Sequence, residues 1–71
     1  MPVPVVEVFS GDSVSVTYFP EADEYVIRES LNASPEQIAA AWASAELDGR
    51  WVSDQYMEGE DYVHVIGAKI Q

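Results

Sequence analysis

His64 is the residue best suited by type to acid–base chemistry, because it is the only histidine in a chain that has no cysteine. A Ser–His–Asp site could be drawn with Ser13 or Ser53, but the G-x-S-x-G turn that presents such a nucleophile is absent. No G-x-x-x-x-G-K-[ST] or G-x-G-x-x-G phosphate loop occurs either. A lone histidine inside an apolar strand-like segment is usually structural. The sequence therefore predicts no catalytic residue and a protein that is not an enzyme.

Carboxylates dominate the remaining chemistry, with thirteen Asp and Glu against three Lys and Arg. Paired carboxylates can hydrolyse glycosides, but a chain of 71 residues is too short to wall a sugar cleft. The acidic segments 21–24 and 58–61 could offer oxygens to Ca²⁺, yet neither has the D-x-[DN]-x-[DN]-G spacing with its distant Glu. Thiolate zinc sites are excluded by the lack of cysteine. We therefore predict no metal and no cofactor.

The formal net charge of −10 restricts the partners that the protein can bind. Nucleic acid and anionic lipid are both repelled by such a charge. Basic surfaces attract it, and these are common on proteins that bind nucleic acid. Acidic charge also keeps a small protein soluble without any partner, and this alternative stays open. The chain shows no signal-peptide pattern and no membrane-length apolar run, so we expect a cytoplasmic location.

The elements that must position these residues follow from the periodicity of apolar side chains. Alternating apolar and polar residues, bounded by Gly, Pro and Asp, predict strands. A switch to helical spacing predicts one helix after the third strand. The whole chain, 1–71, has the length of a single domain. The expected strands are 3–9, 13–19, 25–29, 50–57 and 62–70, and the expected helix is 35–47.

The helix has clear start and stop signals. Ser34 can cap it, Pro35 suits its first turn, and Gln37 completes a capping box. Gly49 is expected to end it as the left-handed C-terminal residue. Trp42 is the expected anchor on the sheet, because it belongs to an apolar face. That face consists of Ile38, Ala41, Trp42 and Ala45.

The element order βββαββ predicts an α+β domain, with a mainly antiparallel sheet and one helix packed across it. Because each connection reverses the chain, its acidic turns should gather at two ends of the domain. The first acidic pole is defined by Glu21, Asp23, Glu24, Glu46 and Asp48. The second acidic pole is defined by Glu58, Glu60 and Asp61, with Asp12 and Glu36 at the same end.

Two features point to a functional role for exposed residues, and a merely solvated rim stays open as the alternative. If the helix reaches residue 47, Glu46 and Asp48 oppose its dipole at a cost of roughly 0.3–1 kcal/mol each. A partner, not local stability, would then explain their place. The strand 50–57 has two ambiguous faces. If Val52 and Tyr56 face inward, Trp51 is left outside as a plausible interface anchor.

The overall profile of the chain resembles one functional group, without any motif in common. A single acidic α+β domain that lacks cysteine is similar to the small phage-encoded inhibitors, especially anti-CRISPR proteins and DNA mimics. The resemblance implies a non-enzymatic inhibitor that covers a basic surface of a nucleic-acid-handling protein. It would bind neither nucleic acid nor membrane directly. The binding residues would be the two acidic poles and Trp51. The alternative is a structural or assembly module, such as a phage-particle component or a homodimer, joined through strand edges and Trp51.

Overall fold

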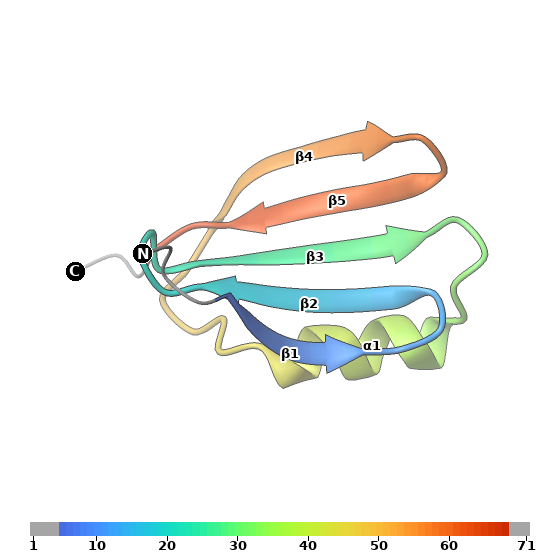
Figure 1. The fold of residues 1–71 in the computed structure, drawn as a ribbon, viewed down its shortest axis with the longest axis horizontal. Helices are drawn as coiled ribbons and strands as arrows, with labels where there is room; N and C mark the ends of the chain where they lie inside the picture. Colours follow the sequence, from blue (N-terminus) through green and yellow to red (C-terminus); the bar gives the residue numbers. More distant parts are fainter. Residues whose placement is uncertain (1–4, 69–71) are drawn as a thin grey trace.

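The structure, a computed structural model, describes residues 5–68 and contains one helix and one five-stranded sheet (Figure 1). All neighbouring strands are antiparallel. This confirms the predicted α+β class and the order βββαββ. The elements are β1 (Val6–Ser10), β2 (Val14–Phe19), β3 (Glu24–Ser30), α1 (Pro35–Ser44), β4 (Val52–Glu58) and β5 (Asp61–Ile66).

The strands are arranged in the order β1-β2-β3-β5-β4. The first three form the predicted meander. The chain then crosses the sheet as α1, and the β4–β5 hairpin returns with β5 beside β3. The helix contacts β1, β2 and β3, and in Figure 1 it lies behind the sheet. One face of the sheet is therefore helix-covered and the other is open, while β4 is an edge strand beyond the helix.

The core lies between α1 and the helix-covered face, where alternate residues point inward. Val14, Val16 and Ile27 are fully buried there, as the alternation of apolar residues predicted. Ala41 is the buried residue of α1, and its small side chain lets the helix approach the strands closely. The remainder of the predicted apolar face, Ile38, Trp42 and Ala45, packs against this cluster.

The start of the helix is confirmed, but its predicted end is wrong. Ser34 Oγ accepts from the Gln37 backbone N–H at 3.2 Å, with Pro35 in the first turn. Among residues 5–68 the Gln37 side-chain oxygen has no hydrogen-bond partner, so the reciprocal half of the capping box is not made. The helix ends at Ser44, because Ala45 is extended at φ −96° and ψ 147°.

The reason for this early end lies in the loop that follows. Leu47 packs against the core, which requires the chain to leave the helical path. The Arg50 N–H then bonds the Leu47 carbonyl at 3.0 Å. Gly49 adopts φ 75° inside this turn, so it is left-handed as predicted but is not the helix cap.

The β4–β5 connection is a two-residue hairpin loop. Glu58 pairs with Asp61, which leaves Gly59 and Glu60 to turn the chain. Gly59 has φ 63°, the conformation that a type II′ turn needs at its first central position. Strand β1 begins at Val6 and runs one residue beyond its predicted end, and β5 ends at Ile66, earlier than predicted. The predicted strand residues 3–4 and 69–70 lie outside the described residues.

Candidate functional site

The turns lie at two ends of the sheet, as the sequence predicted. Figure 1 shows the turn of residues 20–23 and the segment that follows α1 together at the left end. The turns at 11–13 and 59–60 lie at the right end, with the start of α1. The two acidic poles are therefore separate ends of the molecule, but their members have different environments.

Asp23 in the first acidic pole is part of an internal ion-pair network. Arg50 Nη2 lies 2.8 Å from Asp23 Oδ1, and Arg50 Nη1 donates to the Asp23 carbonyl at 2.7 Å. The same guanidinium also donates to the carbonyls of Gly67 and Glu46, at 3.1 and 2.8 Å. The Arg50 side chain is only 4% exposed and lies over the Tyr25 ring at 5.0 Å. Asp23 therefore fixes the fold and is a poor choice for a partner-binding residue.

This network also changes the titration of its members. Tyr18 Oη donates to Asp23 Oδ1 at 2.7 Å, and this hydrogen bond is the main reason that the pKa of Tyr18 is raised. The hydrogen bond with Asp23 is likewise the largest influence on Arg50, whose pKa is raised. Both effects favour the protonated donors, so the network persists throughout the neutral range.

Glu46 and Asp48 lie beyond the helix, which corrects the argument from the helix dipole. They follow the extended residue Ala45 and are exposed, so they do not sit in the last helical turn. Arg50 bonds the Glu46 backbone carbonyl, while its charge is paired with Asp23. Among the described residues no ion pair forms at the side chains of Glu21, Glu24, Glu46 or Asp48. These four residues are called the free first pole below.

The second acidic pole is mostly paired within the molecule. Arg28 Nη1 lies 3.1 Å from Glu58 Oε1 and 3.3 Å from Asp61 Oδ2. Arg28 is 37% exposed, so each pair adds little to stability. The pairs still neutralise charge, and Glu60 is the member of this pole with no ion pair in the described part of the chain. Of the residues that define the two acidic poles, four carboxylates of the first and one of the second are therefore without an ion pair in the described chain.

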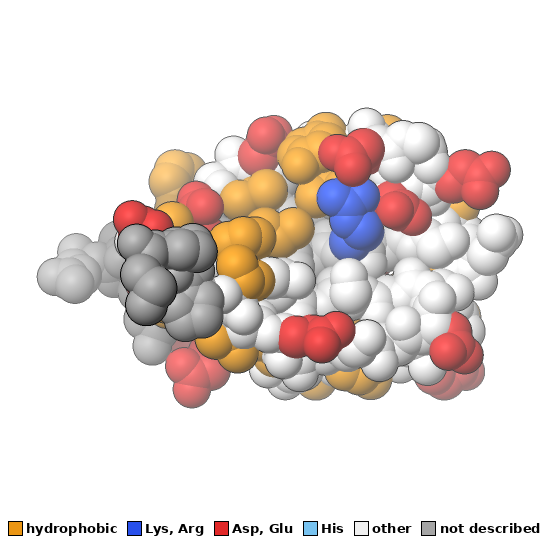
Figure 2. All heavy atoms as spheres, viewed as in Figure 1, with side chains coloured by type: hydrophobic (Ala, Val, Ile, Leu, Met, Phe, Trp, Pro, Cys, Tyr) orange, Lys and Arg blue, Asp and Glu red, His pale blue; other side chains and the backbone are white. Residues whose placement is uncertain are grey.

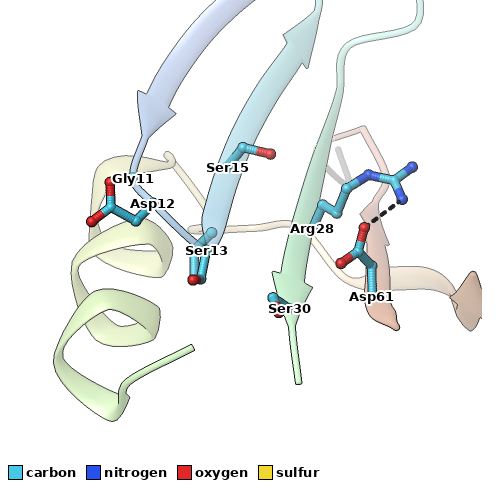
Figure 3. Close-up of a pocket in the computed structure, with 8 residues that line it drawn as sticks. Gly11, Asp12, Ser13, Ser15, Arg28, Ser30 and Asp61 are labelled. Atoms are coloured by element: carbon cyan, nitrogen blue, oxygen red, sulfur yellow. Dashed lines mark hydrogen bonds and ion pairs between the residues drawn. The ribbon is translucent and has the colours of Figure 1, made fainter. Parts of the chain in front are cut away.

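A polar hollow of about 220 Å³ lies on the open face beside Arg28 (Figure 3). Ser13, Ser15, Ser30 and Asp61 contribute to its lining. Figure 3 shows the guanidinium of Arg28 turned toward Asp61, while the hydroxyls of Ser13 and Ser30 point elsewhere. The polar groups do not converge on one point, so the hollow lacks the arrangement of a ligand site.

His64 belongs to a structural cluster on the helix-covered face. It is 8% exposed, its Nδ1 lies 3.0 Å from Gln55 Oε1, and its Nε2 lies 3.2 Å from Glu29 Oε1. Trp42 Nε1 donates to Glu29 Oε2 at 2.7 Å, and the Tyr62 ring stacks on His64 at 4.4 Å. Nε2 makes no hydrogen bond within the described residues, although it lies within ion-pair distance of Glu29. Sequence reasoning missed Glu29, although its place after Tyr25 and Ile27 on a buried face was a signal.

The edge strand β4 resolves the ambiguity of segment 50–57, because neither of its faces is buried. Every residue of β4 is exposed, including Val52, Tyr56 and Met57. Trp51, just before the strand, is 62% exposed. Asp54 Oδ1 accepts from the Gln55 backbone N–H at 2.9 Å, and a charged side chain on an edge strand discourages pairing with another strand. The strand and Trp51 form a second candidate interaction surface.

No group of three or more His, Cys, Asp or Glu residues within residues 5–68 is placed to hold a metal ion. No helix of the described chain is long and apolar enough to cross a membrane. Comparison with known proteins found no matching family model, no matching curated protein and no matching solved structure.

Proposed function

We propose that the protein is a non-enzymatic inhibitor that binds a basic surface of a nucleic-acid-handling protein through the free first pole. The proposal rests on one observation: both arginines form ion pairs with acidic residues outside the free first pole. Arg50 is held by Asp23, and Arg28 by Glu58 and Asp61. The free first pole has no such counter-charge within the described residues.

The charge of the whole chain supports the same class of partner. With a net charge of −10, the protein attracts basic surfaces over a Debye length of about 8 Å at physiological salt. Basic surfaces are a feature of proteins that bind nucleic acid. The anti-CRISPR-like and DNA-mimic profile agrees with this class, and a cytoplasmic location would bring inhibitor and target together. Direct binding to nucleic acid is disfavoured by the same charge.

Neutralising the free first pole should weaken partner binding without harming the fold. The partner is first captured from host lysate and identified by mass spectrometry. The test variant combines Glu21→Gln, Glu24→Gln, Glu46→Gln and Asp48→Asn, and it leaves Asp23 in place. Four charge contacts at roughly 0.2–1 kcal/mol each predict a loss of affinity between about fourfold and a thousandfold, together with a smaller salt slope. Calorimetry at low and high salt measures both.

A charge-matched control separates the pole from the total charge. It combines Glu7→Gln, Asp12→Asn, Glu36→Gln and Asp54→Asn, which removes the same number of charges elsewhere. The control should retain most of the affinity. Equal losses in the two variants would mean that only net charge matters, and unchanged binding in both would contradict an acidic binding site.

The exposure of β4 favours a second candidate function, a structural or assembly module that forms homodimers. An edge strand presents unpaired backbone groups that can bind another strand. Antiparallel pairing of two β4 strands about Gln55 would set Asp54 opposite Tyr56, so the two Asp54 side chains would not face each other. The Gln55 N–H would exchange its bond with Asp54 Oδ1 for one across the dimer, and the exposed Tyr56 and Met57 would be partly covered.

This second candidate predicts the opposite response to salt. Two protomers that each carry a net charge of −10 repel one another, so salt should promote dimerisation. Sedimentation equilibrium at high protein concentration would measure the dimer fraction as salt is raised. Met57→Glu should abolish the dimer, whereas Leu31→Glu, at an exposed site outside the strands, should not. A chain that stays monomeric at every salt concentration would contradict assembly through β4.

A further inference from the structure

An apolar hollow of about 420 Å³ lies on the open face, next to the free first pole. Figure 2 views the open face and shows hydrophobic side chains gathered over part of it, with acidic side chains around them. The hollow differs from the polar one beside Arg28, because most of its lining is apolar. Its described lining residues are Phe19, Glu21, Ala22, Glu24, Val26 and Val65.

The strand register explains how this hollow forms. Val26 of β3 pairs with Val65 of β5, which places two branched apolar side chains side by side on the open face. Phe19, the last residue of β2, pairs with Glu24, the first residue of β3. Glu24 precedes Val26 by two residues, so both side chains lie on the open face. The turn that follows Phe19 brings Glu21 and Ala22 to the rim. The result is an apolar floor with two carboxylates at its border.

A side chain that binds in this hollow must suit both the apolar floor and the two carboxylates at its rim. A purely apolar side chain would bury the carboxylates of Glu21 and Glu24 without a partner, which is costly. A nucleic acid would bring phosphates toward them. A lysine or arginine side chain fits both parts, because its aliphatic stem covers apolar surface while its charged head stays at the polar rim.

We propose that this hollow binds a lysine or arginine side chain that projects from the basic partner surface. The inference rests on the proposed function, and it adds that one partner side chain inserts its stem between Phe19, Val26 and Val65. Charge complementarity would guide the partner to this end of the molecule. The apolar floor then adds specificity that charge alone does not give.

The test uses two probe peptides of equal charge and different stem length. Hexalysine carries four methylenes in each side chain, and hexa-diaminobutyrate carries two. Each is titrated into the protein at mildly acidic pH, where both ammonium groups are protonated, and methyl NMR signals are followed. Hexalysine should bind more tightly and shift the methyl signals of Val26 and Val65. Hexa-diaminobutyrate should contact the carboxylates of Glu21 and Glu24 and leave the methyl signals of Val26 and Val65 nearly unchanged.

Substitutions in the floor separate this inference from the proposed function. Val26→Thr with Val65→Thr keeps branched side chains and should weaken hexalysine binding by about fourfold for each valine. Val6→Thr on β1 is the matched control, because Val6 is an exposed strand valine outside the hollow, and it should have no effect. Equal affinity of the two probes, with unmoved methyls and silent floor variants, would overturn the inference even if neutralising the free first pole abolishes binding. Failure of both probes to bind would contradict the proposed function as well.

Discussion

Replacing Arg50 with methionine is expected to lower the free energy of unfolding by about 2–4 kcal/mol. The guanidinium satisfies carbonyls from the 20–23 turn, the loop after α1 and the segment after β5. Methionine fills similar space but leaves these oxygens without their donor. Asp23 would also lose its ion pair, although its partial exposure lets water replace part of that interaction.

Arg28→Met is the matched control for this prediction. Arg28 also pairs with acidic residues, but its side chain and those of its partners are about one-third exposed or more, so the expected loss is about 1 kcal/mol or less. Urea denaturation followed by tryptophan fluorescence would compare the two variants. Similar midpoints for Arg50→Met and Arg28→Met would contradict a structural role for the buried guanidinium.

Local periodicity was sufficient to predict most of the fold. The alternation in β2 and the branched residues of β3 identified the buried faces, because a strand that covers a core must place apolar residues at every second position. The cap at Ser34 identified the helix start for a similar local reason, since one side chain satisfies a backbone donor of its own segment. Short turns then determined which ends of the strands meet.

The features that could not be predicted depend on contacts between distant segments. Arg50 and Asp23 lie far apart in sequence, and nothing local to either residue indicates that they meet. Their pairing changed the interpretation of the first acidic pole, because it removes Asp23 from the partner-binding set. The end of the helix was missed for a related reason. Alanines favour continuation of the helix, but packing of Leu47 against the core overrides that local preference.

The exposure of β4 was also beyond local reasoning. Its sequence contains enough apolar residues for one buried face, but burial depends on what lies above the strand. The helix is ten residues long and contacts β1, β2 and β3, so it does not extend over the β4 edge. The protein thus carries two different candidate interaction surfaces, an acidic end and an exposed edge strand. Salt is predicted to weaken binding through the acidic end and to promote dimerisation through β4, so measurements at several salt concentrations would decide between them.

Trp42→Ala is expected to lower the free energy of unfolding by about 3 kcal/mol, which is a large part of the stability of so small a domain. Trp42 packs against the core and places its indole edge on His64 at 5.0 Å. Its Nε1 donates to Glu29 at 2.7 Å, so truncation leaves a largely buried carboxylate with fewer partners as well as a cavity.

Trp42→Phe divides this loss into its two parts. Phenylalanine retains most of the ring but has no N–H, so we expect a loss of about 1–2 kcal/mol, from the unsatisfied Glu29 carboxylate. Thermal melts followed by far-ultraviolet circular dichroism would rank the three proteins. An unchanged melting temperature for Trp42→Ala would contradict the anchoring of α1 through this residue. Equal losses for Ala and Phe would instead mean that the hydrogen bond to Glu29, and not the packing of the indole ring, holds the helix against the sheet.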